Sequence, residues 1–109
     1  GTFETASIAA QPVSKLTLTV QGEYTAEYDK YLYEFGWYVH PMIEDTTYTI
    51  RLVDEDGDTE DLYTGSATAL DGDAGYETLE SDIIYEYVQI ILEDGSLGLE
   101  VPIVEKIAY

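Results

Sequence analysis

The sequence predicts an all-β fold, arranged as a two-sheet antiparallel sandwich of about seven strands. Three observations carry this prediction. Apolar and polar residues alternate with a period of two in several short segments, Asp-Gly pairs separate some of these segments, and no stretch shows the pattern of an amphipathic helix of normal length. Because 109 residues is close to the usual size of one domain, we expect a single domain over residues 1–109.

Four segments show the alternation most clearly. In each, every second side chain is apolar, as in a strand with one face on a core and the other in water. They are residues 15–20, 31–40, 47–52 and 97–103. The face of the second segment that we expect to fill the core carries Tyr31, Tyr33, Phe35 and Trp37. Pro102 lacks a backbone donor, which predicts an edge position for the last strand.

Two further segments are expected to be strands with less regular patterns. Residues 62–70 are rich in small and β-compatible residues, whereas residues 83–92 are apolar on both faces. A strand of the second kind is either central and covered on both sides or presents one face to a partner. The stretch around Ile8 is a candidate seventh strand. This number of short strands favours a sandwich, with a closed barrel as the alternative.

Asp-Gly pairs mark the turns. Asp56-Gly57 and Asp94-Gly95 each lie between two expected strands, which predicts two β-hairpins, since both residue types tolerate positive φ. A third pair, Asp71-Gly72, opens a polar stretch that we expect to be a connection with a short helical turn over residues 76–80.

The segment Asp45–Leu52, which reads DTTYTIRL, carries a resemblance to a known family. It resembles the tyrosine-corner strand of fibronectin type III and related immunoglobulin-like modules, and the similarity is centred on Thr46–Leu52. The resemblance implies an immunoglobulin-like sandwich.

The charge balance restricts the partners. The chain has 23 acidic and four basic residues, for a formal net charge of −19. The basic residues lie in four separate segments, at Lys15, Lys30, Arg51 and Lys106. Because nucleic acids and anionic lipids are bound by clustered cations, we expect neither as a partner. No run of 18 apolar residues occurs, so membrane insertion is not expected either. Mutual repulsion at this charge predicts a monomeric isolated domain.

The densest polar segment is a candidate metal site. Asp54, Asp56 and Asp58 have the spacing that opens an EF-hand calcium loop. An EF-hand would need Gly and Glu where this chain has Thr59 and Gly65. We therefore expect a solvated turn and no cofactor, with a looser calcium site in a hairpin tip as the alternative.

Aromatic residues are the candidate ligand-binding groups. Exposed aromatic rings stack on sugars and anchor protein partners. Because the aromatic residues of one face of segment 31–40 are expected in the core, the surface candidates are Tyr24, Tyr28 and Tyr38.

The sequence favours a non-catalytic role. It has no Cys, one histidine (His40, before Pro41) and no Ser set in a nucleophile-elbow motif. We expect a spacer or adhesion module of a larger bacterial surface or secreted protein, of which a chain beginning with Gly1 is a piece. Its partners would be neighbouring domains, surface proteins or glycans, and its location extracellular or at the cell surface. The alternatives are a carbohydrate-binding module and a virion or phage-tail structural protein.

Overall fold

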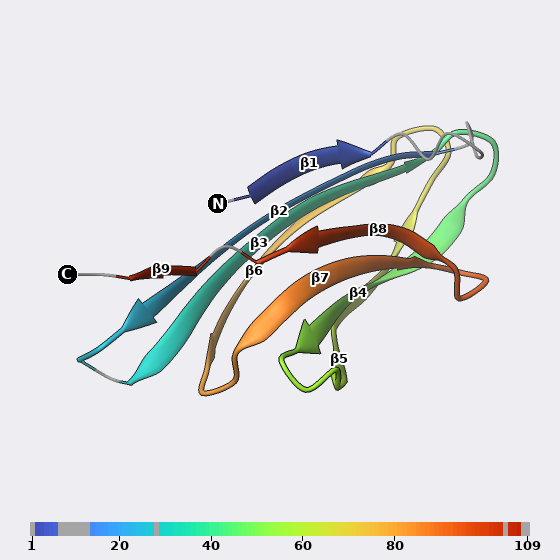
Figure 1. Ribbon diagram of the computed structural model, residues 1–109. Helices are drawn as coiled ribbons and strands as arrows, with labels where there is room; N and C mark the ends of the chain where they lie inside the picture. The colour runs from blue at the N-terminus through green and yellow to red at the C-terminus, as the bar shows by residue number, and fades with distance from the viewer. Residues whose placement is uncertain (1, 7–13, 28, 104, 108–109) are drawn as a thin grey trace.

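The computed structural model describes residues 2–6, 14–27, 29–103 and 105–107. These residues form an all-β fold with two sheets packed face to face (Figure 1). The described part of the chain contains no helix, and so none of the length and apolar character needed to cross a membrane. Its strands are β1 (Thr2–Ala6), β2 (Ser14–Thr25), β3 (Lys30–Pro41), β4 (Thr46–Asp54), β5 (Thr59–Ala67), β6 (Asp73–Ser81), β7 (Tyr85–Leu92), β8 (Leu97–Pro102) and β9 (Glu105–Ile107).

The two sheets differ in length. The long sheet has the order β1-β2-β3-β6, with β9 also pairing with β2, and the short sheet has the order β5-β4-β7-β8. All described pairings are antiparallel except that between β2 and β9. This arrangement confirms the predicted two-sheet sandwich over the barrel. The edge position of β8 also confirms the prediction from Pro102.

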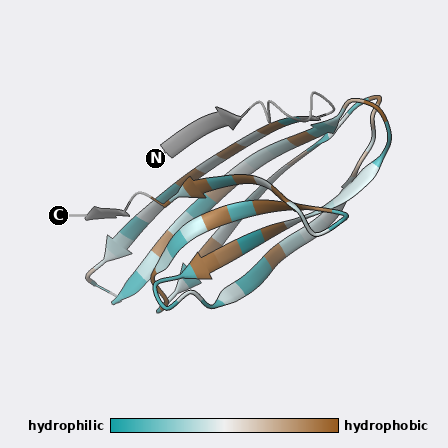
Figure 2. Cartoon of the chain, turned by 45° about the vertical axis from the view of Figure 1, so that its right-hand side comes forward, coloured by the Kyte–Doolittle hydropathy of each residue, from teal (hydrophilic) through white to brown (hydrophobic). Residues whose placement is uncertain are grey.

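The core lies between the sheets and follows the alternation of the sequence. Along β3, the odd-numbered side chains from Tyr33 to Val39 are buried, whereas the even-numbered ones are exposed or half-buried. Figure 2 shows apolar and polar segments alternating along the strands of both sheets. The buried residues are Leu16, Leu18, Val20, Tyr33, Phe35, Trp37, Val39, Tyr48, Ile50, Leu52, Ala67, Tyr85, Val88, Ile90, Leu99 and Val101. Tyr31 packs against this set and is partly buried.

Both predicted Asp-Gly hairpins form, with the same geometry. The tripeptide Glu-Asp-Gly occurs at residues 55–57 and 93–95. In each copy the glycine amide donates to the carbonyl three residues earlier, and the glycine has a positive φ, 86° at Gly57 and 84° at Gly95. The aspartate before each glycine does not have a positive φ. These are therefore three-residue hairpin loops ending in a glycine bulge, which require a left-handed conformation at glycine only.

The expectation for the polar stretch after Asp71-Gly72 was wrong. Instead of a connection with a helical turn over residues 76–80, the chain forms the edge strand β6, which pairs with β3 from Ser81 to Asp73. The segment lacks apolar alternation because the residues paired with Phe35, Trp37 and Val39 of β3 are Glu77, Gly75 and Asp73. A Cβ atom at Gly75 would lie 2.3 Å from the indole of Trp37, so the absence of a side chain makes room for the ring.

The remaining strand predictions agree with the structure in part. Of the predicted segment 83–92, Tyr85–Leu92 forms β7, which lies inside the short sheet between β4 and β8. Its inner face is on the core. On its outer face Tyr87 is 39% exposed and Gln89 is half-buried, whereas Ile91 is buried, at 9% exposed. An additional N-terminal strand is present as β1, whereas Ile8 lies outside the described residues.

The segment that resembles a tyrosine corner forms the start of β4. Tyr48 is 1% exposed, and its hydroxyl donates to Oδ2 of Asp73 at 2.6 Å and accepts from Nε1 of Trp37 at 2.8 Å. In the tyrosine corner of immunoglobulin-like domains the hydroxyl bonds to backbone a few residues upstream. Here the hydroxyl instead connects Tyr48, on the short sheet, to the side chains of Trp37 and Asp73, both on the long sheet.

The difference in strand length creates an overhang. β2 and β3 have 12 residues each, whereas β7 has eight and β8 has six. At about 3.3 Å per residue, the hairpin of β2 and β3 extends beyond the short sheet, as its tip shows at the lower left of Figure 1. The domain is accordingly elongated, with extents of 47 × 23 × 22 Å. One end of the core is thus covered by a single sheet.

Candidate binding site

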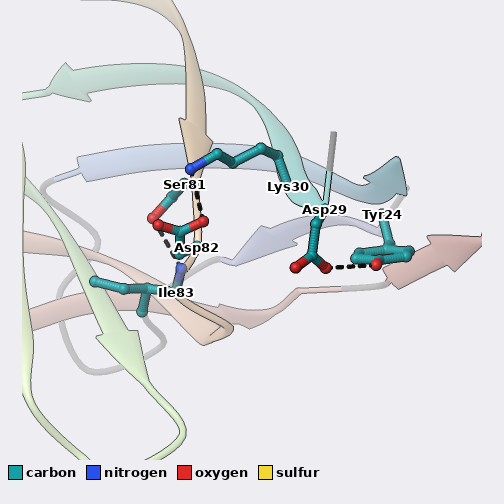
Figure 3. A network of polar contacts seen from close by, with 6 residues as sticks. All are labelled: Tyr24, Asp29, Lys30, Ser81, Asp82 and Ile83. Atoms are coloured by element: carbon teal, nitrogen blue, oxygen red, sulfur yellow. Dashed lines mark hydrogen bonds and ion pairs between the residues drawn. The ribbon is translucent and has the colours of Figure 1, made fainter. Parts of the chain in front are cut away.

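Tyr24, the first predicted surface aromatic residue, lies on this overhang. It pairs across the hairpin with Tyr31 and therefore shares the inward face of the long sheet, with the two ring centroids 5.2 Å apart. The Tyr24 hydroxyl donates to Oδ1 of Asp29 at 2.6 Å (Figure 3), and this bond raises the pKa of Tyr24. Asp29 has a positive φ of 52° in the turn between β2 and β3.

An ion pair joins the overhang to the neighbouring turn. Lys30, the first residue of β3, lies 2.7 Å from Oδ1 of Asp82, which follows β6 (Figure 3). The hydrogen bond to Asp82 raises the pKa of Lys30. In the same turn, the amide of Ile83 donates to Oγ of Ser81 at 3.0 Å. The pair therefore connects the tip of the hairpin to the β6–β7 turn.

The structure separates Tyr38, another of the predicted surface aromatic residues, from Tyr24. Tyr38 lies on the opposite face of the long sheet, and it is seven residues from Tyr31 along β3, or roughly 23 Å. Its hydroxyl donates to the carbonyl of Asp71 at 3.1 Å and is hydrogen-bonded to Nδ1 of His40 at 3.3 Å. Tyr28 lies outside the described residues. Tyr24 and Tyr38 therefore do not form one surface.

The predicted metal ligands lie in the β4–β5 hairpin. The Oδ1 atom of Asp54 accepts from the backbone amides of Asp56 at 2.8 Å and of Asp58 at 2.9 Å. The carboxylate thus stabilises the turn through its own backbone. Within the described residues, no group of three or more His, Cys, Asp or Glu side chains is placed to hold a metal ion.

A cleft of about 340 Å³ opens under the overhang, between the ends of the two sheets. We refer to it as the aromatic cleft, because half of its lining residues are tyrosines. β3 contributes two of them, and the start of β7 and the end of β8 provide the other side. The lining residues are Tyr31, Tyr33, Ile84, Tyr85, Glu86, Tyr87, Pro102 and Ile103.

A β-bulge at the start of β7 gives the cleft its polar group. The pairing of β4 with β7 shifts there, since Val53 is opposite Tyr87 but Asp54 is opposite Tyr85. Glu86 is therefore an extra residue, and it is exposed. A bulge breaks the alternation of faces, so that three consecutive residues reach the cleft although Tyr85 is 4% exposed and Tyr87 is 39% exposed.

Tyr33 and Tyr85 form the floor of the aromatic cleft. Their rings are T-shaped, at 69° with centroids 5.4 Å apart. The Tyr33 hydroxyl donates to the carbonyl of Ile83 at 2.7 Å and accepts from the amide of Tyr85 at 3.1 Å. The Tyr85 hydroxyl donates to the carboxylate of Glu60. Burial, and then this bond, raises the pKa of Tyr85 to about 12.

The aromatic cleft is electrostatically negative. Glu86 is the one charged side chain among its lining residues, in a chain of net charge −19. Two of the four basic residues are paired with carboxylates outside the lining, Lys30 with Asp82 next to the cleft and Arg51 with Asp61. The described lining holds one carboxylate and no imidazole, and it offers mainly aromatic ring surface and negative charge.

Sequence reasoning located the two segments that build this cleft but not their combination. The segment 83–92 was expected either to be central or to present one face to a partner, whereas Tyr31 and Tyr33 were expected to lie in the core. The bulge at Glu86, within the Tyr85-Glu86-Tyr87 run, was not expected. The signal that could have found the site is that run itself, because a charged residue between two aromatics interrupts an otherwise apolar strand.

Comparisons with known proteins do not assign a family. No protein-family model matches the sequence, and no curated protein matches it. The chain is similar to the Northeast Structural Genomics Consortium target SoR45, with a TM-score of 0.45 and 12% identity over 84% of this chain and 82% of that one. It is also similar to a Bordetella pertussis protein assigned as ApaA, with a TM-score of 0.36 and 15% identity over 84% and 89% of the two chains.

Proposed function

We propose that this chain is a non-catalytic binding module, an adhesive unit of a larger bacterial surface or secreted protein, which holds its partner in the aromatic cleft. The observation that carries the proposal is the cleft itself, in which four tyrosines meet at the open end of an elongated sandwich. Aromatic side chains in concave sites are the usual anchors of binding partners. In this proposal the module is immunoglobulin-like, as the resemblance of Thr46–Leu52 implies, and it is extracellular, as the sequence pattern favours.

The chemistry of the cleft supports binding over catalysis. Hydrolysis of a glycosidic bond generally uses two carboxylates about 5–10 Å apart, whereas the described lining contributes Glu86 alone. The acidic surface is consistent with a domain that acts as a separate unit, because strong like charge keeps copies of it apart.

A carbohydrate ligand is the second candidate at the same site. It is favoured by the pair of Tyr24 and Tyr31, whose tilted rings lie on the overhang beside the cleft. Sugar rings stack on aromatic faces of this kind. In this version the overhang supplies the stacking platform, and the module targets a glycan.

The test is adhesion of the intact domain. Beads coated with the wild-type domain should bind a bacterial or animal cell surface, and the variant Tyr31→Ala/Tyr87→Ala should lose most of that binding. The matched control is Tyr76→Ala, because Tyr76 is 63% exposed on β6 and is not among the residues of the cleft. A glycan array probed with the same proteins separates the second candidate. Equal adhesion of all three proteins would refute the assignment of the site to the cleft.

A further inference from the structure

We propose that the aromatic cleft recognises an organic ammonium group, as in choline or a lysine side chain. The inference rests on the proposed binding function and names the chemistry of its ligand. It combines three observations, namely four tyrosine rings around one cavity, a carboxylate within the lining, and a strongly negative chain.

The rings provide the first part of the recognition. The face of an aromatic ring carries negative charge density and attracts a cation that lies within about 6 Å of its centroid. Tyr31, which is partly buried, lies on the long sheet, and Tyr87, which is 39% exposed, lies on the opposite sheet. Tyr33 is 2% exposed and stacks against Tyr31, with centroids 6.2 Å apart, so it supports the Tyr31 ring from below. A cation between the two sheets can therefore contact rings from both sides.

Glu86 provides the charge. It lies in the β-bulge and is exposed, so it keeps water as a partner until a ligand arrives. Because the described lining has no basic residue, an anion would meet only repulsion there. The negative chain as a whole attracts cations at long range and raises their concentration near the surface.

Hydrogen-bonding capacity favours an alkylated cation over a sugar. The Tyr33 hydroxyl already donates to the carbonyl of Ile83 and accepts from the amide of Tyr85, and the Tyr85 hydroxyl already donates to Glu60. Glu86 is the one charged lining group left to accept from sugar hydroxyls, and sugar hydroxyls beyond its reach would lose their water partners, which costs binding energy. Methyl or methylene groups around an ammonium nitrogen need no such partners. The cavity of about 340 Å³ lies at the small end of the usual range for ligand sites.

The experiment is a titration of the intact domain, followed by amide NMR shifts at pH 7. Choline is the probe, and its neutral carbon isostere 3,3-dimethyl-1-butanol is the matched ligand control. We expect choline to shift amides of residues 31–33 and 84–87 with a Kd on the order of 1 mM, which corresponds to about −4 kcal/mol. The isostere should bind at least about tenfold more weakly, a difference of about 1.4 kcal/mol. Equal binding of the isostere, or no saturable shift with choline or a blocked lysine amide, would overturn the proposal.

Variants assign the effect to the cleft. Glu86→Gln should weaken choline binding about tenfold, whereas Glu77→Gln, on β6 and outside the cleft lining, should leave it unchanged. Tyr87→Leu keeps apolar bulk but removes a ring face, and it should weaken choline without affecting the isostere. The blocked lysine amide distinguishes a choline-type ligand from the lysine side chain of a protein partner. A site for methylated ammonium should prefer choline over the lysine amide, whereas a site for lysine side chains should bind both compounds. Unchanged choline binding in both cleft variants contradicts the proposal.

Failure here is distinguishable from failure of the adhesive function. If the beads adhere and adhesion depends on Tyr31 and Tyr87 but choline does not bind, the module is adhesive and the ligand chemistry is wrong. If choline binds as expected but no surface retains the beads, the ligand chemistry is right and the adhesive role is wrong.

Discussion

The hydroxyl of Tyr48 links the two sheets through two hydrogen bonds, and its removal should lower the free energy of unfolding strongly. It accepts from Trp37 at 2.8 Å and donates to Asp73 at 2.6 Å, and Tyr48 itself is 1% exposed. Tyr48→Phe leaves the indole N–H in the core without an acceptor, at a cost of about 1–3 kcal/mol. It also removes a bond to a carboxylate, worth about 1.5–3 kcal/mol, part of which water at the half-buried Asp73 restores. We therefore expect a total loss of about 2–4 kcal/mol.

The assay is urea unfolding at pH 7, followed by circular dichroism. A thermal melt is the parallel measurement. For a chain near 100 residues, each kcal/mol lowers the melting temperature by roughly 4–8 °C, so Tyr48→Phe should melt at least about 8 °C below wild type. Tyr76→Phe is the matched control, because Tyr76 is 63% exposed. The double variant with Asp73→Asn should show a coupling of at least about 0.5 kcal/mol. A loss within about 0.5 kcal/mol of the control for Tyr48→Phe would refute the assignment of this network as a stabilising element.

Three further predictions follow from other contacts. Gly75→Ala should lower the free energy of unfolding by about 1–3 kcal/mol in the same assay, because its Cβ would lie 2.3 Å from the buried Trp37 ring. A variant as stable as wild type would contradict that packing. Because the folded pKa of Tyr85 is raised from 10.0 to about 12 by burial and Glu60, its contribution is complete below pH 10 and is lost as the pH rises through 12; melting curves from pH 9 to 12 should fall, and Tyr85→Phe should make the fall shallower. Millimolar calcium should leave the melting temperature unchanged, whereas Asp54→Ala should lower stability by about 1 kcal/mol because two turn amides lose their acceptor; a large upward shift with calcium would restore the metal-site alternative.

The candidate site could be predicted from sequence only in pieces. The alternation in β3 identifies Tyr33 as inward-facing, yet an inward position becomes a ligand site only where the opposite sheet ends early. The point at which the short sheet ends depends on the lengths of β7 and β8, and the residues of these two strands do not by themselves reveal those lengths. The separation of Tyr24 from Tyr38 likewise depends on register, since pairing with Tyr31 places Tyr24 on the inward face.

The sequence by itself determined the all-β class, the two hairpins and most of the core, because these depend on local alternation and on glycine's access to positive φ. Tertiary structure alone decided the strand β6 and the aromatic cleft. β6 is weakly apolar, and it exists because β3 supplies its partners from Tyr31 to Val39 and because Gly75 accommodates Trp37. The cleft exists because one sheet is longer than the other and because a bulge turns Glu86 toward it, and both are properties of pairing between distant segments.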